Sequence, residues 1–161
     1  MQADGMGERG MVAIERIALP VVGIEQLQIE ARAEGYKFID RLVEEWASGV
    51  NRFDGTGEML FGCFDDGLLV GVGGLNCDPF AGRADVGRVR RVYVRAAWRK
   101  RGIGRALVGA LILEARKSFV CVRLRAENAD AGRLYEGLGF VRYAGPDATH
   151  ILRFEELKGD D

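Results

Sequence analysis

The fold is decided by the stretch VYVRAAWRKRGIGRAL, residues 92–107, where a strand pattern changes into a helix pattern across a basic loop. Residues 92–94 are typical of a strand, and from residue 103 onward apolar side chains recur at helical spacing. Gly102 and Gly104 lie where the helix begins. The first N–H groups of a helix have no partner within the helix, and glycine lets a ligand approach them closely. The junction therefore predicts a phosphate-binding site.

Two common nucleotide-binding motifs do not explain this junction. The dinucleotide fingerprint GxGxxG needs a third glycine where this chain has Leu107, and the P-loop pattern GxxxxGK[ST] does not occur in the sequence. A Gly-x-Gly pair also occurs at ordinary helix starts, so a second motif is needed to distinguish a ligand site from a structural turn.

Outward from the junction, the hydrophobic pattern predicts one α+β domain. Asp65-Asp66-Gly67 is typical of a hairpin turn between two strands. Strands are expected at residues 12–18, 58–64, 68–75, 86–94, 119–124, 140–143 and 149–154. Helices are expected at residues 21–34, between Gly35 and Gly49, and at residues 102–117 and 129–138. We expect residues 1–10 to form a disordered leader and residues 11–157 to form the single domain.

Charge is unevenly distributed along the chain. The 161 residues carry a formal net charge of −1, so the molecule has no bulk positive field to attract nucleic acid or an anionic membrane. Residues 1–87 hold 7 Lys/Arg and 15 Asp/Glu, whereas residues 88–161 hold 16 and 9. We therefore expect an anionic ligand to bind the second half of the chain.

Few residues are available for metal or disulfide chemistry. The three cysteines form no CxxC pair and His150 is the one histidine, which excludes a zinc site by spacing and favours a reducing compartment. No apolar run approaches the ~20 residues of a membrane span, and the first residues lack the apolar stretch of a secretion signal. We expect a cytoplasmic protein with no metal and no membrane association.

A second motif lies in NADAGRLYEGLGF, residues 128–140. It is similar to Asn-x-x-Ala-x-x-Leu-Tyr-x-x-x-Gly-Phe of the GCN5-related N-acetyltransferase (GNAT) family. The junction resembles the Arg/Gln-x-x-Gly-x-Gly/Ala motif of the same family, matched by Arg99, Gly102 and Gly104. Both motifs occur in the family's order with a predicted strand between them, and the resemblance spans about residues 68–154.

The resemblance implies a three-layer GNAT fold. Its mixed, mostly antiparallel sheet has about seven strands, is splayed between the fourth and fifth strands, and is flanked by about four helices. Acetyl-CoA, the cosubstrate, would lie in the gap, with the loop amides binding its pyrophosphate and the 92–94 strand binding its pantetheine arm. The cofactor-binding residues implied are Val92, Tyr93, Val94, Arg99, Lys100, Arg101, Gly102, Ile103, Gly104, Arg105 and Asn128.

Tyr135 is the catalytic residue that the resemblance implies, as general acid for the departing CoA thiolate. A phenol of pKa near ~10 keeps its proton at neutral pH until a thiolate of pKa near ~8.5 forms. Tyr135 lies seven residues after Asn128, on nearly the same helix face, so both can border one groove. The alternative is that Tyr135 only packs in the apolar stripe of its helix.

The sequence does not identify which residue serves as the general base. Where many family members carry a glutamate on the fourth strand, this chain has Arg88, which cannot accept a proton at neutral pH. Asp78, Asp85 and Glu127 are candidates by proximity in the chain, and each is also explained as a solvated surface carboxylate. His150 either borders the acceptor site or is a half-buried strand residue.

The leading hypothesis is an N-acetyltransferase that moves the acetyl group of acetyl-CoA to a primary amine by direct transfer in a ternary complex. The alternative is a non-catalytic CoA-binding or nucleic-acid-associated regulatory module, suggested by the missing glutamate and the basic run over residues 88–105. CoA phosphates explain that run more simply than nucleic acid. The acceptor is a small-molecule or protein amine, and the acidic first half fits a cationic one. Dimers are frequent in the family, so the sequence leaves the oligomeric state undecided between a monomer and a homodimer.

Overall fold

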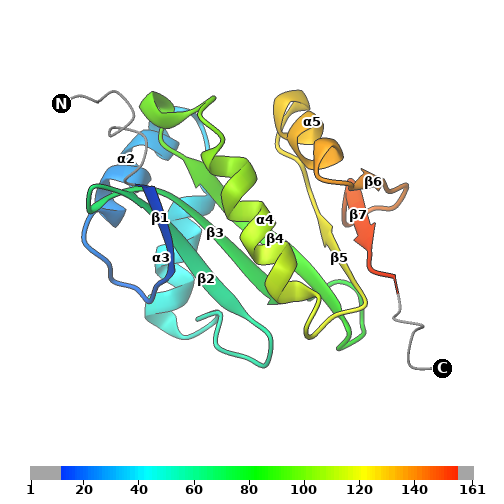
Figure 1. Cartoon of the computed structure of the whole chain (residues 1–161). Helices are drawn as coiled ribbons and strands as arrows, with labels where there is room; N and C mark the ends of the chain where they lie inside the picture. The colour runs from blue at the N-terminus through cyan, green and yellow to red at the C-terminus, as the bar shows by residue number, and fades with distance from the viewer. Residues whose placement is uncertain (1–11, 156–161) are drawn as a thin grey trace.

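The structure is a computed structural model, which describes residues 12–155. Its strands form one seven-stranded sheet in the order β1-β2-β3-β4-β5-β7-β6 (Figure 1), in which β4 and β5 pair in parallel and the other neighbours are antiparallel. The strands are β1 Val12–Arg16, β2 Met59–Asp65, β3 Leu68–Cys77, β4 Val86–Val94, β5 Cys121–Leu124, β6 Val141–Arg142 and β7 His150–Arg153. The helices are α2 Ile24–Ala33, α3 Phe38–Ser48, α4 Ile103–Ala115 and α5 Ala129–Gly137, with the 3-10 turn η1 Ala96–Trp98.

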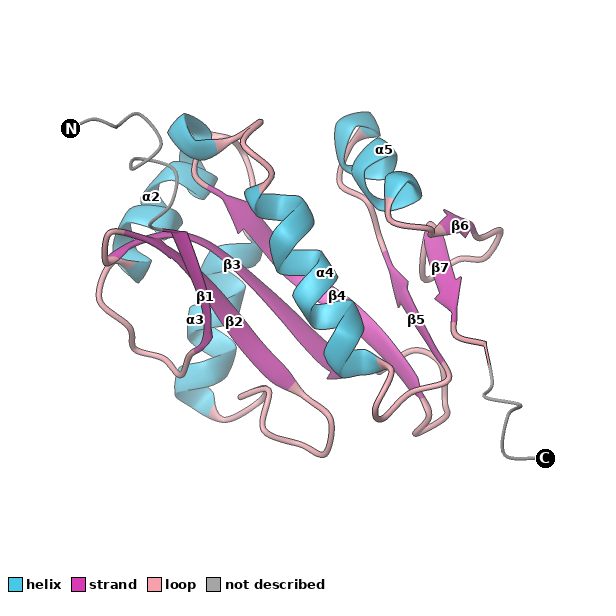
Figure 2. Ribbon diagram, in the orientation of Figure 1, coloured by secondary structure: helices cyan, strands magenta, loops and turns pink. Residues whose placement is uncertain are grey.

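Helices cover both faces of the sheet, which makes three layers. Helices α2 and α3 lie on one face and α4 crosses the other, while α5 lies beside β5 and β7 (Figure 2). Leu27 and Leu42 pack in a buried cluster with Val72 on the first face. Val108 and Leu111 of α4 pack in another cluster on the opposite face. The predicted mixed, three-layer α+β fold is confirmed.

Several element boundaries differ from the predicted ones for local reasons. Helix α2 begins at Ile24 because Gly23 has φ of 99°, a left-handed conformation that stops the helix from extending toward Pro20. Strand β5 begins at Cys121 rather than at Phe119, since the N–H of Phe119 still donates to the backbone oxygen of Ala115 in α4 at 2.8 Å. The predicted leader at residues 1–10, and residue 11 and residues 156–157 of the predicted domain, lie outside the described residues.

Strands β4 and β5 separate after the first third of β4. Their paired residues run from Val86 opposite Cys121 to Arg88 opposite Arg123, and no pair follows. Beyond that point β4 carries a bulge: Arg91 has φ of 61°, and the pairing with β3 shifts by one residue. The predicted splay is confirmed, and one edge of β4 from Val89 onward is left unpaired by β5.

In the described part of the chain, no helix has both the length and the apolarity needed to cross a membrane.

Candidate active site

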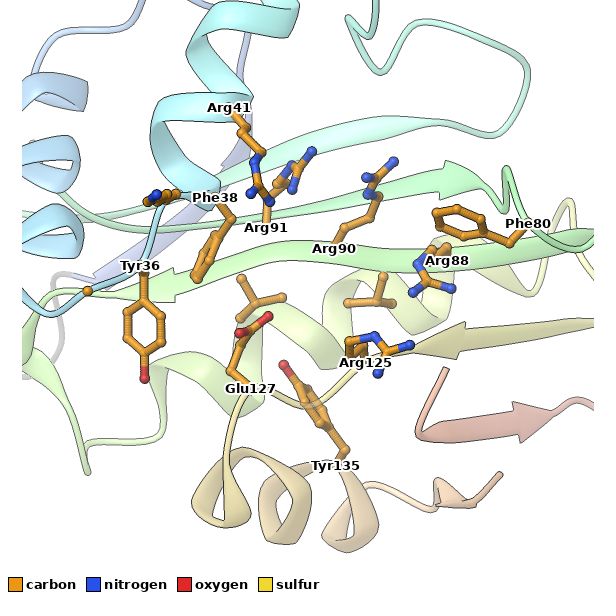
Figure 3. Close-up of a pocket in the computed structure, with 14 residues that line it drawn as sticks. Tyr36, Phe38, Arg41, Phe80, Arg88, Arg90, Arg91, Arg125, Glu127 and Tyr135 are labelled. Atoms are coloured by element: carbon orange, nitrogen blue, oxygen red, sulfur yellow. The ribbon is translucent and has the colours of Figure 1, made fainter. Parts of the chain in front are cut away.

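Two cavities meet where β4 and β5 separate. The α4 cavity, about 390 Å³, lies between the start of α4, the end of β4 and α5. The arginine cavity, about 450 Å³, lies between the start of α3, the middle of β4 and the chain after β5 (Figure 3). Five residues line both cavities: Tyr36, Phe38, Val92, Glu127 and Tyr135. A group passed from one cavity to the other would cross at these residues.

The N-terminus of α4 forms one wall of the α4 cavity and presents uncapped N–H groups. Gly102 is the N-cap residue with φ of 84°, no side chain caps the helix, and its first turn contains no acidic residue. A Cβ on Gly102 would have no atom within 4 Å, so the space in front of the helix is open. A phosphate group fits such a helix start by both hydrogen bonding and charge.

The α4 cavity contains nearly all the residues that the sequence motifs indicated. Tyr135 lines it, as do Val92, Tyr93, Val94, Arg99, Lys100, Gly102, Ile103, Gly104, Arg105 and Asn128. Arg101 is the exception: it is exposed and does not line the cavity. The loop turns sharply around it, with φ of 64° at Lys100, so the motif's spacing alone did not show which of the basic side chains would face outward.

Arg99 connects the loop to α2 through Glu34. Its guanidinium donates to both carboxylate oxygens of Glu34, at 2.7 and 2.8 Å, and to the backbone oxygen of Val94 at 2.8 Å. Tyr93 donates its hydroxyl to the same carboxylate at 2.6 Å. The Arg99 hydrogen bond holds the pKa of Glu34 below its usual value, while burial raises the pKa of Tyr93. Arg99 thus fixes the cavity wall rather than offering an unpaired cation.

The basic run over residues 88–105 meets carboxylates from the first half of the chain. Half of its eight basic residues form ion pairs: Arg88 with Asp78, Arg91 with Glu45, Arg95 with Glu30 and Arg99 with Glu34. The charge asymmetry of the sequence is therefore largely internal pairing, while the binding of CoA phosphates by the run stays a prediction. Lys100 and Arg105 remain beside the α4 N-terminus, where the described carboxylates form no ion pair with them.

Tyr135 is buried at the junction of the cavities. Its side chain comes from α5 and points toward β4, with Glu127 approaching from the chain after β5 (Figure 3). Burial raises the pKa of Tyr135 to about 12, and the nearby charge of Glu127 adds to the effect. Its ring packs edge-on against Phe140 at 5.9 Å. Packing and access to both cavities are thus combined in one residue, so the two roles weighed for Tyr135 do not exclude each other.

Asn128 orders the rim of the α4 cavity. Its side-chain oxygen accepts the N–H of Ala131 at 2.9 Å, which caps α5, and its side-chain nitrogen donates to the hydroxyl of Tyr36 at 3.2 Å. Tyr36 packs against Phe38, with ring centroids 5.5 Å apart. The sequence motifs did not indicate these two aromatic residues, because they lie at the start of α3, where the family match is weakest. Their only signal was an aromatic pair after Gly35.

Of the three candidate bases, Glu127 alone lines the cavities. Asp78 is buried and accepts hydrogen bonds from Arg88 and Arg123; burial opposes ionisation of Asp78, but these contacts outweigh it and lower its pKa. Asp85 pairs with exposed Arg83. Asp78 and Asp85 therefore have structural partners and face neither cavity.

His150 is a buried strand residue and lines neither cavity. Its Nε2 lies 2.8 Å from Oε2 of Glu136, and its Nδ1 lies 2.8 Å from Oγ1 of Thr149. Both ring nitrogens are thus engaged in fixing β7 against α5, which favours the structural interpretation of this residue. Among residues 12–155, no group of three His, Cys, Asp or Glu side chains is placed to hold a metal ion.

The arginine cavity is strongly basic, which the sequence did not reveal. Its charged lining residues are Lys37, Arg41, Arg88, Arg90, Arg91, Arg125 and Glu127. No carboxylate from residues 12–87 lines it, so the acidic excess of the first half does not reach this cavity. The expectation of a cationic acceptor, which rested on that excess, stays a prediction, and the lining of this cavity does not supply the negative charge that it assumed.

Comparison with known proteins agrees with the fold. The family model described as an acetyltransferase (GNAT) domain matches residues 56–142. A candidate acetyltransferase from Exiguobacterium sp. 255-15 is 30% identical, with a TM-score of 0.79 over 88% of this chain and 93% of that one.

Two further structures are similar in fold. The candidate acetyltransferase yncA of Salmonella typhimurium, solved with its cofactor acetyl-CoA, has a TM-score of 0.68 at 19% identity, covering 94% of this chain and 99% of that one. The paia N-acetyltransferase of Thermoplasma acidophilum, in complex with coenzyme A, has a TM-score of 0.59 at 19% identity, covering 89% and 99%. Fold, motifs and family match agree, and the chain belongs to the GNAT family of acetyltransferases.

Proposed function

We propose that the protein transfers the acetyl group of acetyl-CoA to a primary amine by direct transfer in a ternary complex. The observation that carries the proposal is the meeting of two cavities at Tyr135 and Glu127. One cavity has a helix N-terminus suited to phosphate and the other is lined by the start of α3 and the middle of β4, so two substrates can be bound together.

The α4 cavity is the proposed cosubstrate site. The uncapped N–H groups at the start of α4 would bind the pyrophosphate, with Lys100 and Arg105 adding positive charge. The edge of β4 that β5 leaves unpaired, over residues 92–94, would hydrogen bond the pantetheine arm. The relatives solved with acetyl-CoA and with coenzyme A support this assignment by their shared fold.

The residues at the junction have the chemistry that acyl transfer requires. Acetyl-CoA supplies a thioester, whose thiolate leaves readily once an amine has added. Glu127 would accept the proton of the attacking amine, directly or through water, because it is the carboxylate at the junction. Tyr135 keeps its proton at neutral pH, since burial raises its pKa to about 12, and would donate a hydrogen bond to the leaving sulfur.

Initial-rate kinetics test this proposal. Thiol release from acetyl-CoA is followed with a broad panel of amines, and the best acceptor is then varied against acetyl-CoA. Direct transfer predicts intersecting double-reciprocal lines and no acetylated protein by mass spectrometry. Parallel lines with a stable acetyl-protein would contradict direct transfer. Acetyl-CoA binding without thiol release for any amine would favour the non-catalytic CoA-binding module instead.

A further inference from the structure

The arginine cavity contains more positive charge than its surroundings neutralise. Arg88 is paired with Asp78, and Arg91 with Glu45. The four other basic lining residues have no carboxylate within 4.0 Å among residues 12–155: Lys37, Arg41, Arg90 and Arg125. Glu127 is the single acidic residue of the lining and lies at the junction with the α4 cavity. The cavity lining therefore carries a net positive charge, and its one negative group lies beside Tyr135.

The strand register explains how the arginines gather. Arg88 on β4 lies directly opposite Arg123 on β5, and Asp78 accepts hydrogen bonds from both, at 3.3 and 2.8 Å. Arg90 follows two residues after Arg88 on β4, Arg125 follows two residues after Arg123 in the chain after β5, and both line the arginine cavity. No described carboxylate bridges this second pair. Both arginines add positive charge to the same cavity, and a bound anion would offset that charge.

Of these two arginines, Arg90 is the one whose guanidinium has no hydrogen-bond partner in the described part of the chain. It is half-buried. Burial lowers its pKa, and the charge of Arg91 adds to that effect. It also lines a third cavity of about 330 Å³, where Glu45 and Glu58 are present without pairing with it. Its donors are thus free to bind a carboxylate or phosphate, which arginine does with two parallel hydrogen bonds.

We propose that the acceptor is a small primary amine that also carries a carboxylate or phosphate group. The anion would bind Arg90 and Arg125, while the amine points to Glu127 and Tyr135. This inference rests on the proposed acetyl transfer. Val92, which lines both cavities, lies two residues beyond Arg90 on β4, so the same strand borders the proposed anion site and the junction of the cavities.

The same charges suit the acceptor's reactivity. An amine must lose its proton before it attacks, and nearby cations lower the pKa of a bound ammonium group. Arg88, at the position where many family members have a glutamate, contributes to this field. Glu127 provides the one local acceptor for the released proton. A basic cavity therefore reduces the need for a second carboxylate base.

Matched pairs of amines test the proposal. Each ω-amino acid from glycine to 6-aminohexanoate is compared with the alkylamine of equal chain length, and aminoalkyl phosphates and a polyamine complete the panel. We expect kcat/KM to favour the anionic member by at least about 10-fold at the best length, since a charge-assisted hydrogen bond is involved. Arg90→Gln and Arg125→Gln should each reduce that ratio by about 10-fold, with the acetyl-CoA Kd unchanged.

Arg142→Gln is the matched control, because Arg142 is exposed on β6 and lines neither cavity. Equal or faster turnover of alkylamines or the polyamine, or an unchanged ratio in both cavity variants, would overturn the inference while leaving acetyl transfer intact. Binding of N-acetylated ω-amino acids to the CoA-loaded protein is measured in parallel. If that binding occurs and depends on Arg90 but no amine is acetylated, the anion site stands and the proposed function fails. If the protein neither binds these products nor acetylates any amine, the anion site is refuted.

Discussion

Removal of one hydroxyl by Tyr135→Phe separates the two roles that the structure gives this residue. The side chain is 7% exposed, and its ring packs edge-on against Phe140. Phenylalanine keeps that packing, and the hydroxyl donates to no described residue whose hydrogen bond would be lost. We therefore expect the free energy of unfolding to change by less than about 1 kcal/mol.

The magnitude of the catalytic effect follows from the pKa of the phenol. Burial, and secondly the charge of Glu127, raise the pKa of Tyr135 to about 12. Full proton transfer to a free thiolate of pKa ~8.5 would be uphill by about 5 kcal/mol. The phenol is thus a better hydrogen-bond donor to the developing thiolate than a complete proton donor. We expect kcat to fall by about 10²-fold, the lower end of the contribution of a positioned acid.

The assay is steady-state thiol release at saturating acetyl-CoA and acceptor, with the acetyl-CoA Kd measured separately. Tyr143→Phe is the matched control: Tyr143 accepts a hydrogen bond from Arg123 at 3.2 Å but lines neither cavity. That variant should lose up to about 1.5 kcal/mol of stability and keep its kcat. Full kcat in Tyr135→Phe would refute the role of the hydroxyl, and an equal loss in both variants would show a general effect on the fold.

Three further predictions concern the cavities and the buried ion cluster. Gly104→Glu should weaken acetyl-CoA binding in calorimetry by at least about 100-fold, because a carboxylate would face the helix N-terminus. Gly104→Ala should bind acetyl-CoA within about 10-fold of the wild type, since its Cβ would lie 3.7 Å or more from any neighbour. Glu127→Gln should lower kcat by about 10²-fold near neutral pH, and less at alkaline pH, where the amine is already neutral; a pH-independent loss in the rate profile would contradict a role as base. Asp78→Asn should reduce the free energy of unfolding by about 3 kcal/mol or more, measured by denaturant, because Arg88 and Arg123 lose their shared carboxylate. The pKa of Asp78 is lowered by its contacts, so this stability is present above the usual aspartate pKa of about 4 and is lost as the pH falls through the lower folded value. If the free energy of unfolding of Asp78→Asn fell with acid pH as steeply as that of the wild type, the result would contradict this account.

The sequence predicted those parts of the molecule that depend on local pattern. The strand-to-helix junction at residues 92–107 has a short-range cause, the uncapped helix start at Gly102, and the structure shows it. The capping role of Asn128 is equally local, since its side chain reaches the N–H only three residues away. Such features depend on residues that are close together in the sequence, so their spacing is sufficient to predict them.

The parts that spacing missed depend on contacts between distant elements. Tyr36 enters the site because its hydroxyl accepts from Asn128, 92 residues later in the chain. The pairing of Arg99 with Glu34 spans 65 residues, and it makes Arg99, which is predicted to bind the cosubstrate, a fixed part of the cavity wall as well. Charge totals for the two halves could not show either pairing, because ion pairs join the halves across the sheet. For the same reason the basic character of the arginine cavity emerged only from the fold.

Calorimetric titration of acetyl-CoA into the wild-type protein, and into Gly104→Glu, tests the central claim most directly. The account predicts one site per chain with a Kd of tens of micromolar or tighter, no binding of NADH, and loss of the heat signal in Gly104→Glu while its circular dichroism stays that of the wild type. No heat with acetyl-CoA, or equal heat in wild type and Gly104→Glu, would contradict the assignment of the α4 cavity as the cosubstrate site.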